Sequence, residues 1–285
     1  MTVQRVSAAL WGRAPSPEAV ARAEARRLAG PPRTRAVLTI ARDESVFLPI
    51  WLRYYSRFFA PSDIYVLDHG STDGSADGPG FVRIPVRNEN VDVLWVRDAA
   101  QEHQHRLIEG YDAVLYADAD EIVVPHPRLG TLADYLDRFH GRVARCTGYE
   151  LIHLRDREAP FDPARPVLEQ RGHWFPNPLY GKPALARVPV TWGPGFHTCR
   201  EADDEPDPDL FLLHLHRLDY DRCLDRHRAR AAKPWSRVDL ERGWYHQMRI
   251  TEEPHFRRWF YGDTGTRGEI PMRIEPIPEF LRGLF

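Results

Sequence analysis

Three carboxylates stand close together at the end of an apolar run. Residues 114–117 are Val-Leu-Tyr-Ala, and Asp118, Asp120 and Glu121 follow with only Ala119 between them. In an extended strand, alternate residues project to the same face, so we expect Asp118 and Asp120 to point together. Two such carboxylates repel unless a cation lies between them, and Mg²⁺ or Mn²⁺ prefers oxygen ligands. The pattern predicts a divalent ion that also carries a phosphate, although a solvated acidic turn would have the same sequence.

Two more polar clusters follow apolar runs earlier in the chain. The run 36–41 leads into Arg-Asp-Glu at 42–44, and the run 64–67 leads into Asp-His-Gly-Ser-Thr-Asp-Gly-Ser at 68–75. Helical patterns separate the runs, and strands that alternate with helices indicate an α/β fold with a mostly parallel sheet flanked by helices. Ligands bind at the carboxyl ends of the strands in such sheets. All three polar clusters fall at these ends, so we expect them to form one site.

Apolar periodicity and capping residues predict the elements that position this site. We expect strands at 36–41, 64–67, 91–96, 113–117, 143–154 and 210–216, and helices at 16–29, 45–59, 99–109, 131–139, 220–231, 240–248 and 254–260. Residues 156–187 are expected to be irregular, and 188–192 extended. We divide the chain into a peripheral N-terminal helix (1–35), the α/β domain (36–232) and an aromatic-rich helical extension packed on the same domain (233–285).

Charge and cysteine content narrow the function classes. The chain has 39 basic and 41 acidic residues, a net charge of -2, so we expect no nucleic-acid partner. Cys146, Cys199 and Cys223 are widely spaced and indicate neither a disulfide framework nor a thiolate zinc site. A signal-peptide pattern and an uninterrupted apolar stretch of about 18 residues are both lacking. We therefore expect a cytoplasmic protein without an integral membrane segment, and the sequence leaves a homo-oligomer open.

The order of the three polar clusters resembles that of family 2 glycosyltransferases, which have the GT-A fold, a Rossmann-like α/β architecture. The similarity covers roughly residues 36 to 220. The block at 68–75 is its most specific part, because Asp-x-Gly-Ser-Thr-Asp-Gly-Ser is characteristic of that family whereas Asp-x-Asp alone is a weak signal. The resemblance implies transfer of a sugar from a nucleotide donor with the help of Mn²⁺ or Mg²⁺.

The resemblance also implies which residues contact the nucleotide. Arg42, Asp43 and Glu44 would line the nucleotide pocket, and Asp68 would accept hydrogen bonds from the base. This is chemically reasonable because a base presents N–H donors to a carboxylate. His69 stands where many relatives carry a second Asp, so its role is open.

The same resemblance implies a metal and diphosphate site around the acidic edge. Asp118 would face the ribose or the metal, Asp120 would bind the metal directly, and His214 or His216 would complete the site. Both histidines share one face of an expected strand, and imidazole is a frequent metal ligand. Lys182 could meet the diphosphate as a point charge. Hydrogen-bonded histidines and a solvated lysine are the alternatives.

The catalytic base is the least defined part of the predicted site. Inverting transfer needs a carboxylate or imidazole that takes the proton of the acceptor hydroxyl. Relatives use an Asp or Glu downstream of the acidic edge, but no clear Glu-Asp motif opens a helix here. Asp203, Asp204 and His197 are candidates by position only, and His197 could instead line the acceptor side.

The sequence thus predicts a metal-dependent, inverting glycosyltransferase of the hexosyltransferase type. Its donor would be a nucleoside diphosphate sugar, expected to be a UDP sugar, and its acceptor a hydroxyl of a bacterial glycan or a small molecule. One alternative is a phosphohydrolase that forms an aspartyl phosphate, although Ile122 stands where such enzymes carry Thr or Val. The other is a sugar-nucleotide or glycan-binding module that has lost its chemistry, which would explain the lack of a clear base.

Overall fold

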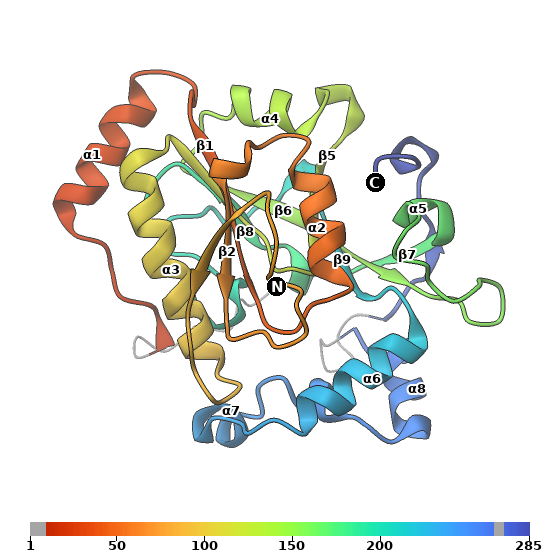
Figure 1. The fold of residues 1–285 in the computed structure, drawn as a ribbon. Helices are drawn as coiled ribbons and strands as arrows, with labels where there is room; N and C mark the ends of the chain where they lie inside the picture. The colour runs from red at the N-terminus through yellow and green to blue at the C-terminus, as the bar shows by residue number, and fades with distance from the viewer. Residues whose placement is uncertain (1–9, 265–270) are drawn as a thin grey trace.

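A computed structural model of the chain describes residues 10–264 and 271–285 (Figure 1). Its ten-stranded sheet has the order β10-β7-β6-β8-β4-β1-β2-β3, and β9 pairs with both β5 and β6 beside this path. The strands are β1 Arg35–Ala41, β2 Ile64–Asp68, β3 Val82–Pro85, β4 Ala113–Tyr116, β5 Glu121–Pro125, β6 Val143–Ile152, β7 His173–Pro176, β8 Pro183–Ala186, β9 Asp207–Arg217 and β10 Glu275–Pro276.

The part of the sheet that carries the polar clusters is parallel. β1 lies between β2 and β4, β3 lies beyond β2, and all four run in the same direction. Ala41 is opposite Asp68, and Leu38 is opposite Tyr116, so the three strands end at the same edge. In the rest of the sheet β6 and β9 are parallel, whereas β5, β7 and β8 pair antiparallel. The predicted α/β fold, with a sheet flanked by helices, is confirmed.

Helices cover both faces of the parallel strands. Those described are α1 Pro17–Leu28, α2 Phe47–Tyr55, α3 Val93–Gly110, α4 Leu132–Arg138, α5 Val167–Gln170, α6 Tyr220–Ala231, α7 Arg237–Arg242 and α8 Glu253–Gly262. α2 packs in one core cluster with Val37 and Leu115, and α3 packs in another with Leu38 and Val114. Because alternate side chains of a strand point to opposite faces, each strand supplies both clusters.

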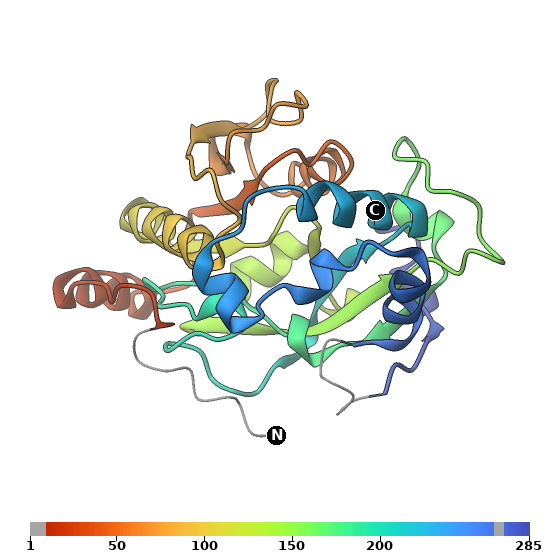
Figure 2. The same cartoon turned by 90° about the horizontal axis from the view of Figure 1, so that it is seen from below.

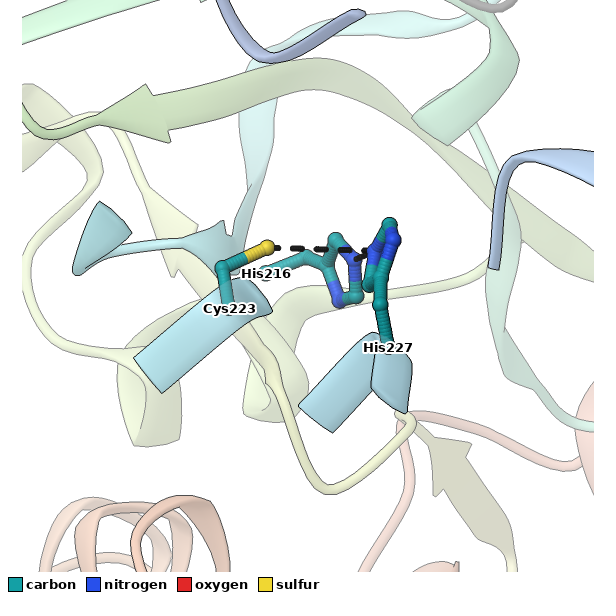
Figure 3. Close-up of side chains that lie close together, drawn as sticks. All are labelled: His216, Cys223 and His227. Carbon is teal, nitrogen blue, oxygen red and sulfur yellow. Dashed lines mark hydrogen bonds between the residues drawn. The ribbon is translucent and has the colours of Figure 1, made fainter. Parts of the chain in front are cut away.

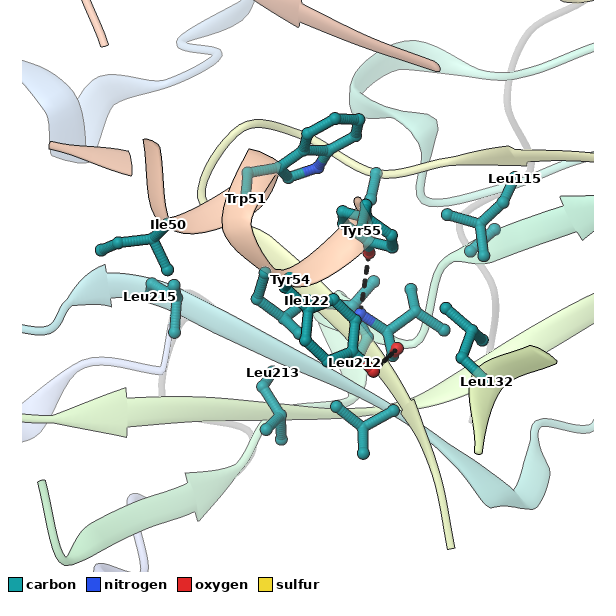
Figure 4. Close-up of a cluster of buried hydrophobic side chains, with 14 of the residues drawn as sticks. Ile50, Trp51, Tyr54, Tyr55, Leu115, Ile122, Leu132, Leu212, Leu213 and Leu215 are labelled. Carbon is teal, nitrogen blue, oxygen red and sulfur yellow. Dashed lines mark hydrogen bonds between the residues drawn. The ribbon is translucent and has the colours of Figure 1, made fainter. Parts of the chain in front are cut away.

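The largest core cluster holds α2 against the strand that follows the acidic edge (Figure 4). Trp51 and Tyr55 are fully buried, and their ring centroids are 4.5 Å apart. The Tyr54 hydroxyl donates to the carbonyl oxygen of Val123 (2.9 Å), and the N–H of Val123 donates to the Tyr55 hydroxyl (2.9 Å). Apolar burial and hydrogen bonds together therefore anchor β5, and with it the turn that connects β4 to β5.

The C-terminal helices lie across the edge at which β1 and β2 end (Figures 1 and 2). Trp235 forms an isolated bridge with Val91, and the Asp239 carboxylate accepts from the N–H of Val93 (3.0 Å). At the other end of the chain, Arg26 of α1 donates to the carbonyl oxygen of Glu109 in α3 (2.8 Å).

None of the described helices has both the length and the apolarity needed to cross a membrane. The three predicted domain limits stay a prediction.

Several predicted elements are wrong, each for a local reason. Residues 91–96 are not a strand, because the Asp92 side chain accepts from the N–H of Trp95 (3.0 Å) and caps α3 there. The strand that follows β2 in the chain is instead the exposed β3, which was not predicted and pairs with β2. Gly243, with a φ of 65°, ends α7 and divides the helix expected at 240–248.

Other predictions failed in the second half of the sheet. The strand β5 was not predicted. The stretch 156–187, expected to be irregular, contains α5, β7 and β8, whereas 188–192 forms no named strand. Short strands such as β7 and β8 have four residues each, which is too few for periodicity to distinguish them from loops.

Candidate functional site

The loops after β1 and β2 are hydrogen-bonded to each other. The N–H of Asp43 donates to Ser71 Oγ (3.1 Å), and the N–H of Thr72 donates to Asp43 Oδ1 (2.8 Å). The N–H of Ser45 donates to Asp73 Oδ2 (3.1 Å). Asp43 has a φ of 56°, a conformation that Asp tolerates better than most residues and that is frequent at functional sites. The two sequence blocks therefore build one structure.

Asp68, at the end of β2, is buried and hydrogen-bonded through both carboxylate oxygens. Its Oδ1 accepts from the N–H of Ser71 (2.8 Å), and its Oδ2 accepts from Arg83 Nε (3.0 Å) and Nη2 (2.6 Å). Burial opposes ionisation, but Ser71 and Arg83 hold the pKa of Asp68 below its ordinary value. A nucleotide base that binds Asp68, as predicted, would have to share this carboxylate with Arg83.

His69 and Arg42 converge on one carbonyl oxygen. His69 Nε2 lies 2.8 Å and Arg42 Nη1 lies 3.3 Å from the carbonyl oxygen of Asn88. Burial lowers the pKa of His69, and the neutral ring, 4.6 Å from Trp95 between centroids, donates this hydrogen bond. An ionised Asp has no donor for this contact, which explains why a His is suited to the position.

The two aspartates of the acidic edge lie in the turn between β4 and β5 rather than on an extended strand. The first carboxylate cluster consists of Asp118, Glu121 and Lys182. Lys182 Nζ lies 2.6 Å from Asp118 Oδ2 and 2.6 Å from Glu121 Oε1. The N–H of Asp118 donates to Glu121 Oε2 (3.0 Å), and the Tyr116 hydroxyl donates to Asp118 Oδ1 (2.6 Å).

Glu121 is the carboxylate for which the sequence offered no role. It has no exposed surface, and burial together with Asp118 raises its pKa to about 7, although Lys182 opposes this shift. Burial would lower the pKa of Lys182, but the two carboxylates raise it above its ordinary value. Glu121 therefore holds Lys182 next to Asp118.

The second carboxylate cluster consists of Glu44, Asp120 and Arg226. Arg226 Nη1 lies 2.6 Å from Asp120 Oδ2, and Nη2 contacts Glu44 Oε1. Arg230 Nη2 lies 3.6 Å from the same Glu44 oxygen. Burial opposes ionisation of Asp120, but Arg226 and His214 hold its pKa well below the ordinary value. For Glu44, burial prevails and raises the pKa despite Arg226.

His214 presents a nitrogen to Asp120. Its Nδ1 lies 3.0 Å from Glu150 Oε1, and its Nε2 lies 3.7 Å from Asp120 Oδ1. A carboxylate that accepts from Nδ1 leaves Nε2 free as a ligand, an arrangement typical of metal-binding histidines. Burial opposes protonation of His214, but Glu150 and Asp120 raise its pKa, so a metal ion would replace a proton there. Asp120 and His214 therefore fit a divalent ion.

His216 lies 3.8 Å from Asp120 and takes part in a buried hydrogen-bond chain (Figure 3). Arg226 Nη1 donates to His216 Nδ1 (2.7 Å), which leaves His216 Nε2 to donate to His227 Nε2 (2.8 Å) and His227 Nδ1 to donate to the carbonyl oxygen of Ile250 (3.2 Å). Ligand atoms of His216, Cys223 and His227 lie within 4.8 Å of one another. Hydrogen bonds use both nitrogens of each ring and account for this cluster.

The three candidate bases differ in their surroundings. His197 Nδ1 lies 2.6 Å from the carbonyl oxygen of Leu179, and burial together with the charge of Lys182 lowers the pKa of His197 to about 4. Asp203 and Asp204 are exposed. Arg145 Nε donates to the main-chain oxygen of Asp203 (3.3 Å). The identity of the base stays a prediction.

Sequence reasoning gave no role to Glu121, Glu150 or Arg226, which hold this edge together. Glu150 is a fully buried acid in a predicted strand, which signals a buried partner but not which one. Arg226 and Arg230 lie one turn apart on a predicted helix just after the two histidines, so both face the same side. Four arginines occur on that helix, and periodicity alone does not indicate which of them contacts an acid.

No protein-family model and no curated protein matches the sequence. Matching solved structures include glucosyl-3-phosphoglycerate synthase from Mycobacterium tuberculosis in complex with Mn²⁺, UDP-glucose and phosphoglyceric acid, which is 21% identical over 48% of this chain and 49% of its own, with a TM-score of 0.28. The same synthase with phosphoglyceric acid is 18% identical over 65% of this chain and 68% of its own (TM-score 0.34). A mycobacterial protein is 19% identical over 70% of both chains (TM-score 0.36).

The first of these matches spans about half of the synthase's own length. At these TM-scores none of the three assigns an activity, a ligand or a metal to this chain. The functional argument below therefore uses this chain's own residues.

Proposed function

We propose that this chain is a glycosyltransferase that moves a sugar from a nucleoside diphosphate donor, expected to be a UDP sugar, to an acceptor hydroxyl. The carrying observation is that Asp120 and His214 approach to 3.7 Å at the edge where parallel strands β1, β2 and β4 end. A carboxylate oxygen and an imidazole nitrogen suit Mn²⁺ or Mg²⁺, and such an ion offsets the charge of a diphosphate.

The residues around the ion would have different roles. Asp120 and His214 would hold the ion. Asp118 and His216, the further ligands that the sequence predicts, would first have to give up their contacts with Lys182 and Arg226. The bound ion would stabilise the charge that develops on the departing diphosphate. Lys182, kept protonated between two carboxylates, would hold Asp118 in place and add positive charge to the same edge.

The nucleotide would lie against the joined loops after β1 and β2. Arg42, Asp43 and Glu44 belong to the first loop, and Asp68 is the last residue of β2, immediately before the second. Hydrogen bonds between the loops support this proposal, because a binding surface that is already ordered does not lose conformational freedom when the ligand arrives.

The acceptor hydroxyl would lose its proton to a base, as inverting transfer of a hexosyl group to a glycan or small molecule requires. His197 has a free Nε2 for this purpose, since its Nδ1 is engaged by Leu179 and its pKa of about 4 leaves the ring neutral near pH 7. Asp203 and Asp204 are the carboxylate candidates.

Calorimetric titration of UDP in the presence of Mn²⁺ tests the proposal. The Asp120→Asn variant removes a charged metal ligand, and we expect its UDP affinity to fall by on the order of 100-fold, because changes around the ligands alone cost roughly 10- to 100-fold at metal sites. Asp225→Asn is the matched control, since Asp225 lies on α6 with its side chain 75% exposed. Equal UDP affinity in wild type and Asp120→Asn would refute the metal assignment.

Hydrolysis of UDP-glucose without acceptor separates an enzyme from an inactive binding module. We expect the wild-type protein to release glucose slowly from UDP-glucose, and only with Mn²⁺ present. Binding of UDP without any such turnover, across nucleotide sugars, would identify a binding module instead.

A further inference from the structure

Arg226 places its positive charge between two acids, Glu44 and Asp120, which follow the ends of different strands. Its guanidinium reaches Asp120 at 2.6 Å and also contacts Glu44, and its side chain is 18% exposed. The guanidinium carbon lies 4.8 Å from the centre of the Phe47 ring. Arg226 thus neutralises the oxygen ligand that the proposed function assigns to the metal ion.

An ion bound to Asp120 and His214 would bring a second positive charge close to this guanidinium. The contact of Arg226 with Asp120 Oδ2 and the approach of His214 Nε2 to Asp120 Oδ1 involve the same carboxylate. Like charges at such short range in a largely buried site repel strongly. The ion and Arg226 therefore compete for Asp120.

A displaced Arg226 has an anion to bind when the donor is present. Arg226 lies on the same face of α6 as Arg230, whose Nη2 is 3.6 Å from Glu44, and Lys233 beyond the helix pairs with Asp43 at 2.7 Å. This side of α6 therefore presents several cations to the loop after β1. A planar guanidinium matches two phosphate oxygens at once, so Arg226 can exchange a carboxylate for a diphosphate with a small movement of its long side chain.

We propose that Arg226 is a built-in counter-ion that a divalent metal displaces from Asp120 and that then binds the diphosphate of the donor. The inference rests on the proposed function of this edge. It assigns Arg226 opposite effects on two ligands: it weakens binding of the metal alone and strengthens binding of the diphosphate once the metal is present.

Titration of Mn²⁺ with and without UDP measures both effects in wild type, Arg226→Gln and the control Arg228→Gln. Arg228 is on the same helix, and its side chain is 53% exposed. We expect Arg226→Gln to bind Mn²⁺ alone more tightly than wild type, by about 5- to 150-fold, the usual range for coupling between two sites. We expect UDP to enhance Mn²⁺ affinity less in this variant than in wild type, by a similar factor. Arg228→Gln should behave like wild type.

Thermal unfolding keeps the test informative if Arg226→Gln is unstable. Removal of Arg226 leaves Glu44 and Asp120 as buried acids without this cation, so we expect a lower Tm in EDTA and a larger rise of Tm with Mn²⁺ than in wild type. Arg226→Lys keeps the charge but loses the two-pronged donor. It should therefore bind Mn²⁺ alone nearly as wild type does, but should show weaker enhancement by UDP.

Two results would overturn the inference. Either Arg226→Gln binds Mn²⁺ no more tightly than wild type, or UDP enhances Mn²⁺ binding equally in both proteins. Each result would show that Arg226 forms a fixed structural ion pair with Asp120 and Glu44. The proposed function would still stand, because the wild type binds both ligands. If the wild-type protein binds neither Mn²⁺ nor UDP, the proposed function fails together with the inference.

Discussion

The two carboxylate clusters at the acidic edge take their cations from different kinds of structure. In the first cluster, Lys182 directly precedes β8, which is hydrogen-bonded to β4 and β6, and its side chain is 6% exposed. In the second cluster, Arg226 extends from α6, and its side chain is 18% exposed. The first cation lies next to the sheet, where the main-chain oxygen of Lys182 accepts from the N–H of Cys146 in β6 (2.9 Å). The second reaches the sheet from a helix packed across its edge.

This difference indicates which of the acids is available to bind a metal ion. Lys182 cannot leave Asp118 and Glu121 without a shift of the main chain beside β8, because its side chain is buried and interiors are packed too closely for such movement. Arg226 can withdraw from Asp120 by rotation of its own side chain. Two histidines differ in a similar way, since burial and Lys182 lower the pKa of His197, whereas Glu150 and Asp120 raise that of His214 against the effect of burial. Asp120 is therefore more accessible to a metal ion than Asp118 is.

Replacement of Lys182 should have the largest effect on stability. Lys182→Met leaves the fully buried Glu121 beside Asp118 without a cation, and we expect the free energy of unfolding to fall by about 3–5 kcal/mol, measured by urea unfolding. Mn²⁺ should not restore this loss, in contrast to Arg226→Gln. The double variant Lys182→Met/Glu121→Gln, which also removes the charge of Glu121, should regain much of the stability. A loss below about 1 kcal/mol would show that the first cluster is as exchangeable as the second.

The pH dependence of stability should sharpen the contrast between the histidines. The pKa of His197 is about 4 in the folded chain and about 6.5 when unfolded, so the unfolded state binds more protons between these values. The free energy of unfolding should be complete above about pH 6.5 and should fall by roughly 1–2 kcal/mol on acidification to about pH 5. His197→Gln should remove that part of the decrease, and the exposed His140→Gln should not. An unchanged pH dependence in His197→Gln would show that burial and Lys182 do not lower the pKa of His197 in the folded chain.

Local signals in the sequence predicted the parallel half of the fold. The runs at 36–41, 64–67 and 113–117 became β1, β2 and β4, because each is too apolar to lie anywhere but in a sheet covered on both faces. Ser16 and Asp219 cap α1 and α6 as their residue types suggest. The convergence of strand ends at one edge follows from parallel pairing.

The ion pairs of the site could not be predicted in this way, because they join residues far apart in the chain. Asp120 and Arg226 are 106 positions apart, and Glu150 and His214 are 64 apart. Glu150 meets His214 because β6 and β9 pair side by side, and Asp120 meets Arg226 because α6 packs over the strand ends. The sequence therefore predicted Asp118, Asp120, Lys182 and His214 as site residues, but not Glu121, Glu150 and Arg226, which hold them in place.

Replacement of Lys233, which lies just beyond α6, should have the smallest effect on stability. Its pair with Asp43 is 2.7 Å long, but the two side chains are 28% and 29% exposed, so we expect Lys233→Met to cost about 0–1 kcal/mol in urea unfolding. Because salt screens exposed charges, the cost should vanish at about 1 M NaCl. The exposed pair of Arg228 with Asp225, removed by Arg228→Gln, gives the baseline for a surface contact. A cost above about 2 kcal/mol that persists in salt would mean that Lys233 fixes the left-handed backbone of Asp43, and the contrast between the fixed Lys182 and the exchangeable cations on and after α6 would then fail.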